Sequence, residues 1–99
     1  MLYRHGDVLI SRVPTLPRNP QRLEGVTLAL GEFSGHSHRI EEAGAARMWA
    51  AGGQKFLEVI LERATLVHEE HRAIALPQGL YRFWMQREYS PEMSRWVED

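Results

Sequence analysis

The chain has no cysteine. Disulfide scaffolds, thiolate zinc sites, iron–sulfur clusters and cysteine nucleophiles are therefore excluded. The chain also lacks a hydrophobic run long enough to cross a bilayer as a helix, and its first residues lack the apolar stretch of a signal peptide. From the sequence we expect a cytoplasmic protein with no membrane association.

An excess of charge of one sign is missing as well. The 12 Lys and Arg residues are balanced by 13 Asp and Glu residues, which gives a formal net charge of −1. This balance argues against a protein that coats nucleic acid or an anionic membrane, so nucleic-acid binding is not expected. The chain has 99 residues, of which 43% are hydrophobic, and this size predicts a single domain, residues 1–99, around one core.

Short apolar runs, separated by glycine and proline, predict strands along the chain. These runs span residues 7–13, 26–33, 47–50, 55–61, 64–68, 73–76 and 80–89. Gly52-Gly53 predicts a hairpin, Pro77-Gln78-Gly79 predicts a turn, and the three prolines of residues 14–20 predict a surface loop outside the sheet. We expect an all-β fold, a small antiparallel β-barrel or sandwich, with a short C-terminal helical turn that begins near Ser90.

Residues 80–89 show the clearest alternation of apolar and polar side chains. Tyr81 and Phe83 share one face of the predicted strand, whereas Arg82 and Gln86 share the other. Trp84 falls on this polar face. An indole in that position needs cover from a loop or from a second copy of the chain, so a homodimer is expected.

Four of the five histidines form two local pairs. His36 and His38 are two residues apart, so on a strand both rings point to the same face. His68 and His71 bracket two glutamates; in a tight hairpin they would be directly opposed, and in a helical turn they would also lie on one side. We predict that the two pairs converge on one divalent metal ion.

Imidazole ligands suit zinc, iron, nickel, manganese and copper, so the sequence does not choose the metal. Four histidines favour a closed, structural site, whereas three histidines and a water favour an open, catalytic one. His5 stands two residues before Asp7, and this pair could supply an extra ligand or a carboxylate that orients one. Glu41 and Glu42 follow the first pair, and one of them could be a fourth ligand or a general base.

The segment GEFSGHSHRIEE, residues 31–42, resembles the first cupin motif, in which a glycine precedes a His-x-His pair and a glutamate follows. The resemblance implies a small β-barrel with a metal in its mouth, with both histidines as ligands and Glu42 at the glutamate position. Pro77-Gln78-Gly79 is similar to the turn of the second cupin motif, but Arg82 stands where that motif has its histidine. The third ligand is therefore expected from His68 or His71.

Four short motifs of the chain also resemble those shared by a set of small uncharacterised bacterial and phage proteins. They are HGDV, GHSH, HEEH and QREY, which begin at residues 5, 35, 68 and 86. This second resemblance marks the histidine motifs as one unit and implies no reaction.

Two functions from different classes fit these observations. The first is a metal-dependent enzyme or small-molecule sensor, in which the metal activates water or binds a substrate oxygen beside a carboxylate base. The alternative is a non-enzymatic interaction or accessory protein, phage- or operon-encoded, with a structural metal or none. A metal with an open coordination position would favour the first function, and a closed site the second.

Overall fold

Residues 2–31 and 35–86 are described by the computed structural model, and they form eight β-strands in one antiparallel sheet. The strands are β1 (Leu2–His5), β2 (Val8–Val13), β3 (Gln21–Leu23), β4 (Thr27–Leu30), β5 (Ser37–Ile40), β6 (Ala46–Ala51), β7 (Gln54–His68) and β8 (His71–Met85). The expected all-β fold is confirmed. In these residues no helix is long and apolar enough to cross a membrane. The helical turn expected near Ser90 lies outside the described residues.

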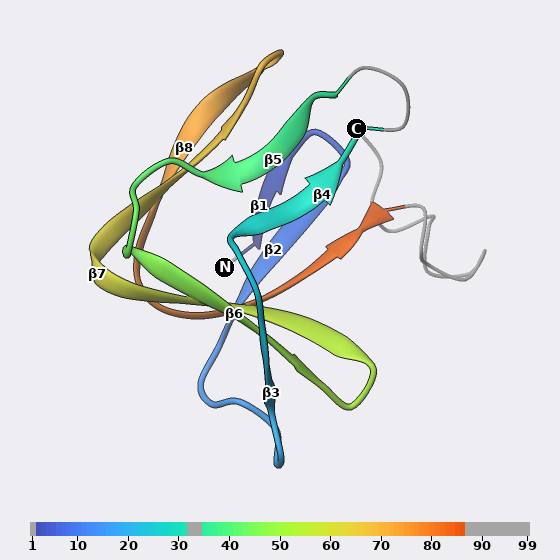
Figure 1. Cartoon of the computed structure of the whole chain (residues 1–99), viewed down its shortest axis with the longest axis vertical. Coiled ribbons are helices and arrows are strands. Elements are labelled where there is room, and N and C mark those ends of the chain that lie inside the picture. The colour runs from blue at the N-terminus through green and yellow to red at the C-terminus, as the bar shows by residue number, and fades with distance from the viewer. Residues whose placement is uncertain (1, 32–34, 87–99) are drawn as a thin grey trace.

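The sheet curls into a half-barrel (Figure 1). Its strand order is β1-β2-β8-β7-β5-β4, and β6 pairs with β7 on one side and with β3 on the other. The two longest strands, β7 and β8, have 15 residues each and pair with each other over most of their length. Along its other edge, which does not face β8, β7 pairs first with β6 and then with β5. The long β7–β8 hairpin therefore connects the two ends of the curled sheet.

This hairpin shows that one prediction is wrong. Residues 55–61 and 64–68 belong to one strand, as do residues 73–76 and 80–85, and Pro77-Gln78-Gly79 lies inside β8 instead of forming a turn. The pairing register shifts between Val59 and Arg63, opposite these residues. The glycine there has a φ of +150°, a conformation that other residues rarely adopt. The Pro-x-Gly segment marks an irregularity within a continuous strand.

The same register shift explains why each long strand reads as two short ones in the sequence. Leu57 and Val59 are buried before the shift, whereas Ala64 and Leu66 are buried after it, so the inward positions change from odd to even residues. Side chains alternate with a period of two, and a bulge in the pairing changes which parity faces the core. The hydrophobic periodicity is therefore broken although the strand continues.

Glycines form the tight turns. Gly52 and Gly53 have φ values of 58° and 76°, as the type I′ turn of a two-residue hairpin requires, and they join β6 to β7 as predicted. Gly6 has a φ of 62° in the turn between β1 and β2. Residues 14–20 form the predicted loop without sheet pairing. The short strands β1 and β3 were not predicted, because three or four residues are too few for alternation to be recognised.

The hydrophobic core fills the inside of the curl. Its fully buried large side chains are Val8, Ile10, Leu57, Val59, Leu66, Leu76 and Tyr81. The predicted inward face of β8 is confirmed by Tyr81 and Phe83. On the opposite face the Arg82 guanidinium lies 4.6 Å from the ring centroid of Trp84, so Arg82 supplies part of the cover that this indole needs.

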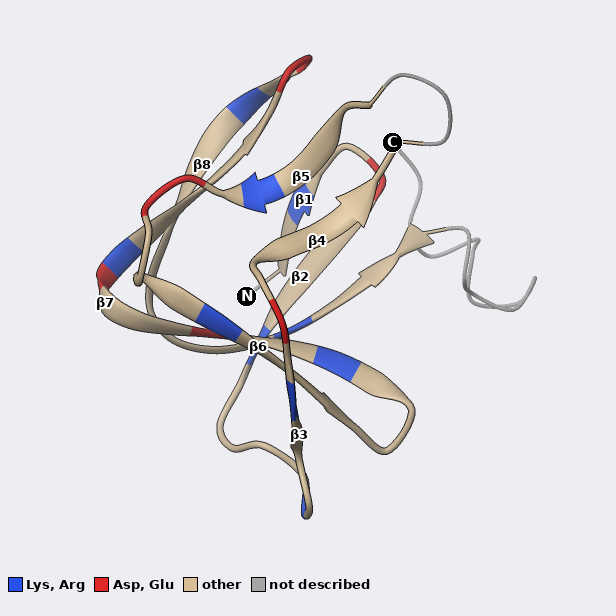
Figure 2. Ribbon diagram, viewed as in Figure 1, with Lys and Arg blue, Asp and Glu red and all other residues tan. Residues whose placement is uncertain are grey.

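Basic and acidic residues are spread over several of the described strands and turns (Figure 2). Arg39 on β5 pairs with Glu69 at 2.9 Å, and Arg47 on β6 lies 3.8 Å from Glu58 on β7.

Two leucines of β7 test how much the core stabilises the hairpin. Leu66 is fully buried, whereas Leu61 is 52% exposed. We expect Leu66→Ala to lower the free energy of unfolding by about 2–5 kcal/mol, because it removes buried methyl groups and leaves a cavity. The matched control Leu61→Ala should change it by less than about 0.5 kcal/mol. Urea denaturation followed by tryptophan fluorescence measures both, and equal effects would contradict the described orientation of β7.

Candidate metal centre

The histidines occupy inward-facing positions at the ends of their strands. His38 lies two residues before the buried Ile40 in β5, and His68 lies two residues after the buried Leu66 in β7. His5 is the last residue of β1 and is 2% exposed. Because alternate residues of a strand share a face, each ring points into the end of the curl. The histidine cluster is the polar end of the hydrophobic core.

The β7–β8 turn presents His68 and His71 together. The two residues are directly paired, as the hairpin alternative predicted. Glu69 and Glu70 form the turn without positive φ values, so it is not one of the primed turns that match the twist of a hairpin. A register shift between Leu66 and His68 accommodates it, since a bulge adds the local twist that such a turn lacks.

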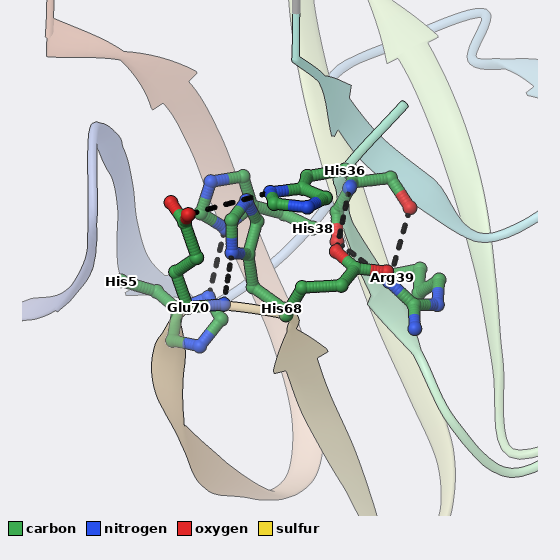
Figure 3. A network of polar contacts seen from close by, with 8 residues as sticks. His5, His36, His38, Arg39, His68 and Glu70 are labelled. Atoms are coloured by element: carbon green, nitrogen blue, oxygen red, sulfur yellow. Dashed lines mark hydrogen bonds and ion pairs between the residues drawn. The ribbon is translucent and has the colours of Figure 1, made fainter. Parts of the chain in front are cut away.

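The predicted convergence of the two histidine pairs is confirmed. The ring centroids are 4.3 Å apart for His38 and His68, 4.6 Å for His68 and His71, and 5.5 Å for His36 and His68. Figure 3 shows the labelled rings gathered in one place. His5 joins them, with its centroid 4.9 Å from that of His38. All five histidines of the chain therefore meet at one end of the sheet.

Among the described residues, the possible ligand atoms near the cluster form two sets of three. One set is His38, His68 and His71, and the other is His36, His68 and Glu69; within each set the atoms lie within 4.8 Å of one another. Nitrogens around a single zinc ion are about 3.3 Å apart, given bonds of roughly 2.0–2.1 Å. Small ring rotations would suffice for either set. His36 thus does not share a donor set with His38, contrary to the simplest interpretation of the His-x-His motif.

Glu69 is already engaged elsewhere, which weakens the second set. Its Oε1 accepts a hydrogen bond from the backbone N–H of Ser37 at 3.1 Å, and its Oε2 pairs with Arg39 at 2.9 Å. Backbone hydrogen bonds, first its own N–H and then that of Ser37, lower the pKa of Glu69. This carboxylate fixes the tip of the β7–β8 hairpin to β5. The all-histidine set therefore fits a metal better.

Two of the rings that would bind metal, His38 and His68, have lowered pKa values that favour their neutral form. Burial, and then the neighbouring His68, lower the pKa of His38 from 6.5 to about 4. Burial also lowers the pKa of His5 and that of His68. A metal binds the neutral imidazole. At pH 7 the lowered pKa values favour this form of His5, His38 and His68.

The carboxylates that follow the His-x-His pair do not reach the site. Glu42 Oε1 accepts from the Thr65 N–H at 2.8 Å and its Oε2 accepts from the Thr65 hydroxyl at 2.6 Å, and the hydroxyl bond is the main cause of its lowered pKa. Glu41 is exposed and belongs to neither donor set. The expectation that one of them is a ligand or base is therefore not supported, because Glu42 instead ties the loop after β5 to β7.

A cavity of about 350 Å³ opens beside the rings. It is lined by Gly6, Asp7, Leu30, Gly31, His36, His38, His68, Glu70, His71 and Met85. His38 is buried, His68 is half-buried and His71 is exposed, so the donor set runs from the core to the solvent. His36 lies at this opening, with its Nδ1 3.8 Å from Glu70. A small molecule could approach an ion held by the inner set from this side.

His5 had only a weak signal in the sequence, and Gly6 had none. A Cβ atom on Gly6 would lie 2.6 Å from Nε2 of His71 and 3.1 Å from Cε1 of His38. Glycine is therefore required here twice, for its positive φ and for the close approach of two rings. Arg82 and Gln86 are not in the cluster: Arg82 stacks on Trp84, and Gln86 Oε1 accepts from Arg4 at 2.9 Å.

The fold and the site define a small all-β domain with a histidine cluster at the open end of a curled sheet. Residues 4–86 match the family model described as a domain of unknown function, DUF8820, and the chain belongs to this family. The matched segment contains all five histidines. No curated protein and no solved structure matches the chain.

Gly6→Ala should disturb the histidine cluster, whereas Gly25→Ala should not. Both glycines have positive φ, 62° and 74°, but a Cβ on Gly25 would meet nothing within 4 Å. Both variants should lose about 1–2 kcal/mol of stability from the backbone alone. The contact with His71 should add a further loss of about 1–3 kcal/mol in Gly6→Ala. Urea denaturation measures the difference; equal losses would contradict the close packing of Gly6.

The stability of the metal-free protein should fall as the pH falls from 6.5 to 5. A folded-state pKa below 6.5 means that the unfolded chain binds more protons in this range, so stability rises with pH there. The lowered pKa of His38 should contribute on the order of 1–2 kcal/mol. Glu42 and Glu69, with pKa values lowered from 4.5, titrate below this window.

The measurement is urea denaturation at several pH values in the presence of a chelator. The variant His38→Gln, which cannot titrate, should show a smaller slope than the wild type. A wild-type stability that stays constant between pH 6.5 and 5 would contradict the burial of neutral imidazoles.

Proposed function

We propose that the protein binds one divalent transition-metal ion through His38, His68 and His71. The observation that carries this proposal is the set of three imidazole nitrogens within 4.8 Å of one another at the end of the core. The lowered pKa values of His38 and His68 support it. So does the engagement of Glu69 with Ser37 and Arg39, which leaves imidazole as the available donor.

Three imidazole ligands suit zinc, iron and nickel, with manganese less favoured by an all-nitrogen set. When bound, such an ion supplies a Lewis acid that can polarise an oxygen or activate water. The chain itself holds three rings, of which His38 is buried, His68 is half-buried and His71 is exposed. All three line the cavity, so an ion held by them would be reachable from it. Asp7 and Glu70 also line this cavity, and their carboxylates are the candidate bases of the proposed reaction.

The cavity beside the three rings supports the enzyme or small-molecule sensor over the accessory protein with a structural metal. In the open form His36 stays at the rim of the cavity, outside the donor set of His38. In a closed, structural form His36 would supply a fourth nitrogen. The half-barrel with histidines at its mouth also supports a cupin-like relationship, which we retain as part of the proposal.

The proposal predicts that purified protein carries about one metal ion per chain and that a chelator lowers its melting temperature at pH 7.5. A ligand at 100 times its Kd stabilises the folded state by about 2.7 kcal/mol. At pH 5 the chelator effect should shrink, because protons compete for imidazole. Elemental analysis and thermal denaturation, with and without chelator, measure these effects.

Single substitutions distinguish the open site from the closed one. His38→Ala and His71→Ala should abolish metal binding, whereas His36→Ala should retain it with at most a small loss of affinity. An equal loss in all three variants would favour the closed, structural site. A wild-type protein that carries no metal and melts at the same temperature with chelator would contradict the proposal and favour an interaction module.

A further inference from the structure

His5 is the most deeply placed histidine, and both of its ring nitrogens are engaged. Nε2 lies 2.9 Å from the backbone carbonyl oxygen of Arg72. Nδ1 lies 2.9 Å from Nδ1 of His38 (Figure 3). Arg72 has no partner in the β7–β8 register, where the pairing shifts near the turn. Its carbonyl is therefore available to a side chain from β1.

These two contacts fix where the protons lie. A carbonyl oxygen only accepts, so Nε2 of His5 must donate to Arg72. A neutral imidazole has one N–H, so Nδ1 of His5 is left as an acceptor, and the proton in the bond to His38 must come from Nδ1 of His38. Nε2 of His38 is consequently left with a free lone pair.

We propose that His5 is a positioning residue that holds His38 in the tautomer able to bind a metal through Nε2. This inference rests on the proposed metal site and adds a residue that does not itself bind the ion. A hydrogen bond to the non-binding nitrogen of a ligand histidine fixes its ring and makes the other nitrogen a better donor. Here the acceptor is a second histidine, His5, which is itself anchored on a backbone carbonyl.

His68 provides an internal comparison. Its Nδ1 accepts a hydrogen bond from the backbone N–H of Glu70 at 3.0 Å, so its proton lies on Nε2. His68 must therefore change its tautomer to bind a metal through Nε2, whereas His38 needs no change. The two ring centroids are 4.3 Å apart, yet the two imidazoles carry their protons on different nitrogens.

The first test reads both tautomers in the metal-free protein. Long-range proton–nitrogen NMR spectra of histidine-labelled protein at pH 8, with chelator, should show His38 protonated at Nδ1 and His68 protonated at Nε2. On addition of zinc, His38 should keep its Nδ1 proton. A metal-free wild type in which His38 carries its proton on Nε2 would overturn the inference.

The second test compares two substitutions of His5. The amide oxygen of Asn can replace the acceptor Nδ1, so His5→Asn should keep His38 protonated at Nδ1. The longer Gln side chain can replace the donor Nε2 toward Arg72 but places no acceptor at the position of Nδ1. We expect His5→Gln to lower zinc affinity about 10- to 100-fold, and His5→Asn to retain more of it, as measured by competition with a chromophoric chelator.

The two variants separate the role of His5 from its packing. Both variants shorten or reshape a buried side chain. If His5 had only a packing role, both would bind zinc more weakly while the proton of His38 stayed on Nδ1. That result would overturn the inference. So would wild-type affinity in a folded His5→Gln protein. A wild type that binds no zinc would overturn the proposed metal site. The tautomers are measured without metal, so the NMR experiment would still show whether His5 holds His38 with its proton on Nδ1.

Discussion

The hydrogen bond between His5 and His38 joins two parts of the sheet that the backbone does not join. Along the strand order, β1 and β5 are separated by β2, β8 and β7, yet the two Nδ1 atoms are 2.9 Å apart. This contact exists only because the sheet curls until its ends approach each other (Figure 1). The arrangement of the remaining rings, and any metal they hold, depends on that curl.

Placing imidazoles at the end of a hydrophobic core has a physical cost, which the structure offsets with hydrogen bonds and neutral rings. Burial lowers the pKa of His5 and that of His38, since a charged ring would lose its hydration. In a domain of 99 residues the core is small. An ion that binds only the folded state would therefore contribute a large share of the net stability, which couples the folding of this domain to its proposed function.

The carboxylates near the histidines have a structural role that their position in the sequence does not reveal. Glu69 links the hairpin tip to β5 through Ser37 and Arg39, and Glu42 links the following loop to Thr65. Each uses both oxygens for these bonds, so neither is available to an ion without breaking them. These links hold β5 and β7 in place, and so keep the inward rings of both strands close together.

Local spacing determined what could be read from the sequence: strands with alternating faces, and the shared side of each histidine pair, for which a hairpin at His68 and His71 was one of two alternatives. Long-range register decided the rest. Pro77-Gln78-Gly79 resembles a turn, but it lies in a continuous strand because a register shift opposite it changes the inward parity. The partner of His5 could not be predicted either, because it is set by how far the sheet curls, and curl is a property of all the paired strands together.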